Sequence, residues 1–131
     1  MSAIVEVIRS QANLCYMTGA SEDDVNASEK MLGVVFTDEY REYVSAFGAV
    51  LLNGHELTGI CNSPRLNVKD VAMDERSRYP HVSSEWYVIE QTNIDDIVIW
   101  QAPSGEIYLT EPGFQIHKIC NSLLEYISGN Y

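Results

Sequence analysis

Apolar residues recur at helical spacing in the first half of the chain. After Thr37, positions i, i+3, i+4 and i+7 are occupied by Tyr40, Tyr43, Val44 and Phe47. This spacing predicts a helix with one buried face. Thr37 is a good residue to cap its start, and Gly48 follows the last apolar position and is expected to end it.

The same combination of periodicity, caps and stop residues predicts four further helices. Ser21 is expected to cap the second of them with the help of Asp24, and Gly33 to end it in the left-handed conformation. The last helix is predicted from six apolar residues at helical spacing. The four ranges are Ala3 to about Asn13, Ser21 to Leu32, Asn67 to Arg78, and Ile116 to Ile127.

Between these helices the pattern favours strands. Val50–Leu52 and His55–Leu57 flank Asn53-Gly54, a pair typical of the tight turn in a β-hairpin. Further strands are predicted over Trp86–Glu90, Ile94–Trp100 and Glu106–Leu109. The mixed order predicts an α+β fold with helices packed on a mostly antiparallel sheet. At 131 residues, the chain is expected to form a single domain over positions 1–131.

The charge balance narrows the possible partners. The chain carries 19 acidic and 8 basic side chains, a formal net charge of −11. Such a field repels nucleic-acid phosphates, so no direct nucleic-acid binding is expected. It attracts a basic protein, although acidic charge also serves solubility alone. The N-terminal sequence lacks the pattern of a signal peptide, no stretch is long enough for a membrane span, and the three cysteines form no motif, which predicts a cytoplasmic location.

No residue pattern indicates catalysis, a metal or a cofactor. His55, His81 and His117 are scattered and lack the spacing of metal ligands. Carboxylates occur as adjacent pairs, whose side chains diverge on a helix or strand instead of facing one cleft. Two of these pairs are explained by helix starts, where acids favour the positive end of the helix dipole. A cysteine nucleophile assembled from distant positions stays open, since sequence alone does not forbid it.

The ordered series of these features resembles the SUKH superfamily. The resemblance rests on Glu29-Lys30-Met31-Leu32-Gly33, on the run from Phe36 to Gly48, and on later segments up to the Ser122–Ile127 stretch. Thr37 stands where the family usually has proline. The resemblance implies the α+β fold shared by bacterial immunity proteins and fungal cell-wall assembly regulators. It also implies binding to a protein, often a nuclease toxin, with no cofactor or catalytic residue.

We therefore predict a non-enzymatic immunity protein that neutralises a basic toxin domain by direct binding. Its contact surface is expected to be acidic and to include Glu22, Asp23, Asp24, Asp38, Glu39, Glu56, Asp95 and Asp96. A regulatory or scaffold domain that binds a different client protein is the first alternative. The second is a hydrolase whose site gathers His55, Glu56 or a cysteine. The oligomeric state is left open.

Overall fold

The structure, a computed structural model, describes residues 2–113 and 115–129. Within these residues the chain forms one seven-stranded antiparallel sheet and five helices, which confirms the predicted α+β fold. In chain order the elements are α1 (Ala3–Arg9), β1 (Cys15–Thr18), α2 (Glu22–Leu32), α3 (Asp38–Ala46), β2 (Phe47–Leu52), β3 (His55–Leu57), α4 (Val68–Arg78), β4 (Tyr87–Gln91), β5 (Val98–Gln101), β6 (Ile107–Glu111), β7 (Gln115–Cys120) and α5 (Leu123–Ser128).

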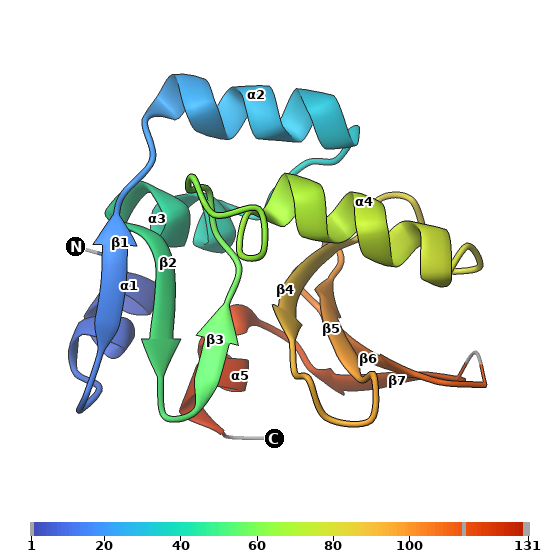
Figure 1. Ribbon diagram of the computed structural model, residues 1–131. Helices are drawn as coiled ribbons and strands as arrows, with labels where there is room; N and C mark the ends of the chain where they lie inside the picture. Colours follow the sequence, from blue (N-terminus) through green and yellow to red (C-terminus); the bar gives the residue numbers. More distant parts are fainter. Residues whose placement is uncertain (1, 114, 130–131) are drawn as a thin grey trace.

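The sheet is a meander in which each strand pairs with its neighbours along the chain, so β1 and β7 are its two edges. In Figure 1, α1 and α5 lie behind the strands β1–β3, while α2 and α4 run across the top of the molecule. Helices α2 and α4 contact each other, and α4 also contacts β4. The helices therefore leave the front of β1–β3 in this view without a helical cover.

The starts of α2 and α3 follow the predicted capping chemistry, whereas Asn67 begins α4 without a side-chain cap. The Ser21 hydroxyl accepts the backbone N–H of Asp24 at 3.2 Å, and the Thr37 hydroxyl accepts that of Tyr40 at 3.0 Å. Gly33 ends α2 with φ 69°, a left-handed conformation that costs glycine little. Thr37 thus supplies the cap at the position where proline is usual in the resembling proteins.

Tyrosines of α3 form the centre of the core. Tyr40 and Tyr43 are fully buried and pack edge to face, with ring centroids 5.5 Å apart. Their hydroxyls meet one residue: Tyr43 donates to the Thr58 carbonyl at 2.6 Å, and Tyr40 lies 3.0 Å from the Thr58 hydroxyl. A buried phenol needs such a partner, so Thr58 allows two tyrosines to serve as core residues.

The largest correction concerns the last predicted helix. Residues 115–120 form strand β7, and the helix covers only Leu123–Ser128. Ile116 and Ile119 fit the helical spacing, but β-branched side chains favour strands, and β7 pairs with β6 along its length. Ser122 caps the short helix by accepting the N–H of Glu125.

Smaller differences from the prediction concern the ends of elements and one strand. Helix α1 ends at Arg9 and not at Asn13, whose φ is 61°. Helix α3 ends at Ala46, because Phe47 is already extended and begins β2. The predicted strand from Ile94 shortens to Val98–Gln101, since residues 95 and 96 adopt positive φ in a turn. Strand β1 was not predicted from the sequence.

Two glutamates bind chain segments to one another by accepting backbone N–H groups. Glu29 of α2 accepts the N–H of Phe36 at 2.7 Å and also pairs with Arg41 of α3 at 2.5 Å. Glu39 of α3 accepts the N–H groups of Leu123 and Leu124 at 2.7 and 2.9 Å. Glu39 thereby satisfies two open donors at the start of α5, more than 80 residues along the chain.

Glu75 is an acid in an apolar position of α4. It stands at helical spacing from Val68, Val71 and Ala72, and like them it is buried, with 2% of its surface exposed. Its Oε2 accepts the side-chain N–H of Gln91 on β4 at 3.3 Å. Burial raises the pKa of Glu75 above its ordinary value of 4.5, although the Gln91 bond and Arg78 oppose the shift.

The first prediction tests the Glu39 cap. We expect Glu39→Ala to lower the free energy of unfolding by about 2 kcal/mol, because two charge-assisted hydrogen bonds to the start of α5 are lost. Glu42→Ala on the same helix is the control, since Glu42 is exposed and its loss should cost less than about 0.5 kcal/mol. Urea unfolding of both variants provides the measurement, and equal losses would contradict the capping role.

The second prediction concerns the pH dependence of stability. Because the pKa of Glu75 is higher in the folded chain than in the unfolded one, its contribution to stability falls as pH rises from 4.5 through the raised value. Glu75→Gln removes this loss, so the variant should unfold at a higher temperature than the parent at pH 7. The difference should shrink towards pH 4. Exposed Glu85→Gln should show no such pH-dependent gain, and a gain equal at both pH values would refute the burial argument.

Candidate protein-binding surface

The front of strands β1–β3 is an open, largely apolar surface. Met17 and Leu51 are 41% and 44% exposed, although both lie on strands. Their neighbour Tyr16 is 57% exposed, but it pairs with buried Val50 and its ring packs on Phe47, so it points to the opposite side of β1. Together with Cys15 and Leu66, Met17 and Leu51 line a hollow of about 300 Å³. We call Cys15, Met17, Leu51 and Leu66 the β1–β3 face. Exposed aliphatic and methionine side chains gathered in one place are typical of protein-binding surfaces.

One row of side chains crosses this face from strand to strand. Cys15 of β1 pairs with Leu51 of β2, which in turn pairs with Glu56 of β3. The row ends in an ion pair between Glu56 and Arg65. The two terminal nitrogens of the Arg65 guanidinium, Nη1 and Nη2, each donate to one carboxylate oxygen of Glu56. These hydrogen bonds lower the pKa of Glu56. Glu56 is thus a charged residue at the border of the face, with Arg65 as its neighbour.

A second hollow continues the surface towards α2. It measures about 760 Å³ and lies between α2, β1 and the segment after β3. Met17 lines both hollows, which makes them adjacent across β1. Met31 and Cys61 also line the second one, and Met31 is 63% exposed. Flexible thioether side chains adapt to partners of different shape, so this continuation suits a protein contact.

The structure brings only part of the predicted acidic set to this surface. Asp24 lines the second hollow, and its neighbours Glu22 and Asp23 are exposed on the same first turn of α2. Glu56 lines the first hollow. Asp24 and Glu56 therefore border the β1–β3 face and its continuation, and Glu22 and Asp23 lie beside Asp24 on the first turn of α2.

The other four predicted residues lie elsewhere. Asp38 and Glu39 line a hollow beside the start of α5, where Glu39 is already bound to backbone N–H groups. Asp95 and Asp96 are exposed in the turn between β4 and β5. In Figure 1 this turn is at the bottom of the view and the start of α2 is at the top. The eight residues do not form one continuous face.

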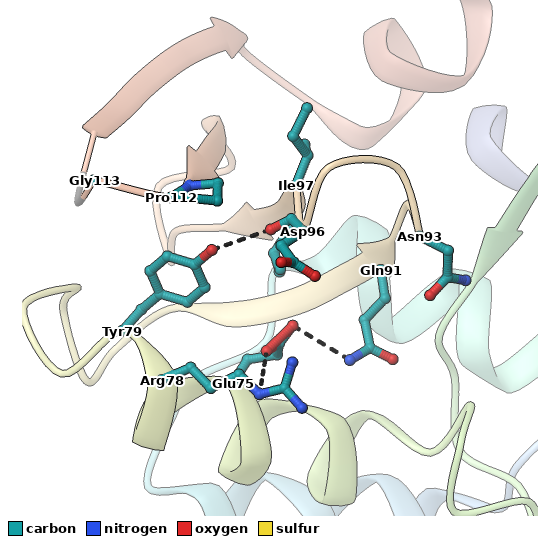
Figure 2. Close-up of a pocket in the computed structure, with 10 residues that line it drawn as sticks. Glu75, Arg78, Tyr79, Gln91, Asn93, Asp96, Ile97, Pro112 and Gly113 are labelled. Carbon is teal, nitrogen blue, oxygen red and sulfur yellow. Dashed lines mark hydrogen bonds and ion pairs between the residues drawn. The ribbon is translucent and has the colours of Figure 1, made fainter.

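A polar hollow between α4 and the β4–β5 turn was not predicted from the sequence. Its volume is about 320 Å³, and Glu75, Arg78 and Gln91 lie on one side of it. Tyr79 donates a hydrogen bond from its hydroxyl to the backbone carbonyl of Asp96 at 3.0 Å, which fixes the turn over the end of α4 (Figure 2). One sequence signal could have revealed this hollow. Glu75 is an acid at a position where the helical spacing of the neighbouring apolar residues predicts another apolar side chain.

His55 and Cys120, two of the residues considered for chemistry, are engaged in contacts within the fold. His55 lies 3.0 Å from Glu90 through Nδ1, and the Tyr126 hydroxyl donates to the same carboxylate oxygen. This cluster links β3, β4 and α5, and His55 lines none of the hollows described above. Cys120 is buried, and desolvation raises the pKa of its thiol. A raised thiol pKa disfavours the reactive thiolate.

Metal ligation and membrane spanning were also considered for residues 2–113 and 115–129, the part of the chain that the structure describes. No group of three or more histidine, cysteine or acidic side chains in this part of the chain is placed to hold a metal ion. Among the same residues, no helix combines the length and apolar character needed to cross a membrane.

Comparison with known proteins identifies the family. No curated protein matches the chain. A family model, SUKH_5, described as SMI1-KNR4 cell-wall, matches residues 1–128. The match covers every helix and strand described above, including the β1–β3 face and the helix starts capped by Ser21, Thr37 and Ser122. The chain belongs to the SUKH_5 family of the SMI1-KNR4 type.

Proposed function

We propose that this chain is a non-enzymatic immunity protein that binds a basic toxin domain through the β1–β3 face. The observation that carries the proposal is the exposed apolar surface of β1 and β2, bordered by carboxylates of α2 and β3. An apolar centre with a charged rim is the usual composition of a protein-binding patch. Membership of a family with immunity-type members supports the assignment.

Side chains, and not a free strand edge, make the contact in this proposal. Strand β1 is at the edge of the sheet, but its register shifts between Tyr16 and Thr18. Such an irregularity interrupts the regular row of backbone donors and acceptors that strand addition requires. Met17 and Leu51 then serve as anchors, because their exposed apolar side chains contribute contact area on the same face.

Electrostatic attraction directs the encounter with the toxin. The net charge of −11 speeds approach of a basic domain, and the partner's cations meet Glu22, Asp23 and Asp24 at the rim. The toxin is inhibited by occlusion, since bound protein blocks access to its active site. Direct nucleic-acid binding by this chain is no part of the mechanism, because like charges repel. The proposal places the complex in the cytoplasm, where the exposed thiol of Cys15 stays reduced.

The description of the family favours a second candidate function. The matching family model is described as SMI1-KNR4 cell-wall. This description supports a regulatory or scaffold domain that binds a client protein other than a toxin. Co-production of the chain with a toxin domain encoded beside its gene separates the two. Restored growth supports the immunity function, and growth arrest despite stable production of the chain supports the regulatory one.

The third prediction tests the apolar centre of the contact. Met17→Lys should weaken toxin binding at least about tenfold, because it replaces a buried thioether contact with a charge that repels the basic partner. Ile116→Lys is the matched control: Ile116 is 38% exposed on the opposite edge strand β7, against 41% for Met17, and the charge change is the same. Isothermal titration calorimetry measures both. Equal affinities would exclude the β1–β3 face as the contact.

The fourth prediction tests the acidic rim. Combined replacement of Glu22, Asp23 and Asp24 by their amides should slow association about tenfold at low ionic strength. The difference should nearly vanish at about 0.5 M salt, because screening shortens the range of the attraction. The control combines Glu6→Gln, Glu42→Gln and Glu85→Gln, three exposed acids outside the rim. If surface plasmon resonance gives both triple variants the same association rate, the rim has no special role.

A further inference from the structure

The hollow between α4 and the β4–β5 turn has two chemically different sides. Ile97, Val98 and Pro112 form an apolar wall. Glu75 and Asp96, which carry carboxylates, line the rest of the hollow together with other polar residues. Figure 2 shows the Glu75 carboxylate pointing into the space below Asp96, between Tyr79 and Gln91. At about 320 Å³ the hollow is large enough for one side chain or a small molecule.

Glu75 lines this hollow and has one carboxylate oxygen without a hydrogen-bond donor. The residue is 98% buried, and its Oε1 accepts no hydrogen bond from the described residues. Arg78 approaches that oxygen only to 3.7 Å, which is too long for a hydrogen bond. A buried carboxylate oxygen without a donor is costly. A ligand that brings an N–H group to Oε1 would remove this cost.

The charges around the hollow favour a cation. Asp74 and Asp96 both act on Glu75 through space and disfavour its ionisation further. Arg78 is the cation that lines the hollow, and its side chain is 60% exposed and divided between Asp74 at 3.5 Å and Glu75. Three carboxylates thus stand against one loosely held guanidinium. The local excess of negative charge suits a positively charged ligand.

We propose that this hollow binds the side chain of an arginine presented by a polypeptide. The planar guanidinium donates to Glu75 Oε1 and to the Asp96 carboxylate, which a flat fork of several N–H groups reaches together. The aliphatic stem packs on the wall formed by Ile97 and Pro112. The hollow is separate from the β1–β3 face, so the site stands or falls independently of toxin binding.

The test is a titration followed by nuclear magnetic resonance, with Nα-acetyl-arginine amide as the probe. We expect saturable shifts of the Gln91 side-chain amide and the Ile97 backbone amide, with a Kd on the order of 1 mM, typical of a single side chain. Nα-acetyl-citrulline amide has nearly the same shape without the charge, and it should bind at least about tenfold more weakly. Equal binding of the two probes, or no saturable shift with either, would overturn the proposal.

Two variants identify the acceptors. Glu75→Gln should weaken arginine binding about tenfold while the Gln91 contact and the fold remain, and Asp96→Asn should also weaken it. Glu111→Gln, a partly exposed acid on β6, is the matched control and should bind like the parent. Unchanged affinity in Glu75→Gln would refute the site even if Asp96→Asn has an effect.

Two further probes define the ligand class. Nα-acetyl-lysine amide should bind more weakly than the arginine probe, because an ammonium is a point charge and does not span two carboxylates. Free arginine should also bind more weakly, since its own carboxylate adds negative charge beside Asp96. Tighter binding of lysine would overturn the guanidinium assignment, and tighter binding of free arginine would overturn presentation by a polypeptide.

Discussion

The need to bury one face of a meandering antiparallel sheet governs the rest of this structure. Strands β1–β3 are covered from behind by α1 and α5, and α3 supplies the tyrosines that fill the space between. An antiparallel sheet tolerates one exposed face, so the front of the same strands can stay open. The exposure of Met17 and Leu51 follows from this arrangement, and the proposed function follows from their exposure.

Acidic side chains divide into those that hold the fold together and those that remain at the surface. Glu29 and Glu39 accept backbone N–H groups from other segments, and Glu90 accepts from the Tyr126 hydroxyl. Glu22 and Asp23 are exposed on the first turn of α2. The net charge of −11 therefore overstates the charge available to a partner, because several carboxylates are already engaged within the chain.

Local signals predicted the elements whose chemistry is itself local. The caps at Ser21 and Thr37, the stop at Gly33 and the Asn53-Gly54 hairpin depend on neighbouring residues, and all are confirmed. The last predicted helix was wrong because Ile116 and Ile119 fit both a helix and a strand, and pairing with the preceding strand β6 decided for the strand. Similarly, a partner 84 residues away makes Glu39 a cap, and no local pattern reveals that contact. The sequence could name acidic residues but not which of them share a face.

The β1–β3 face is tested most directly by hydrogen–deuterium exchange of the chain alone and in complex with the toxin domain encoded beside its gene. We predict that binding slows exchange of the backbone amides in Cys15–Thr18 and around Leu51, where the partner excludes water. The amides of β7 at the opposite edge of the sheet should exchange at the same rate in both states. Slower exchange on β7 with no change on β1 would contradict the account.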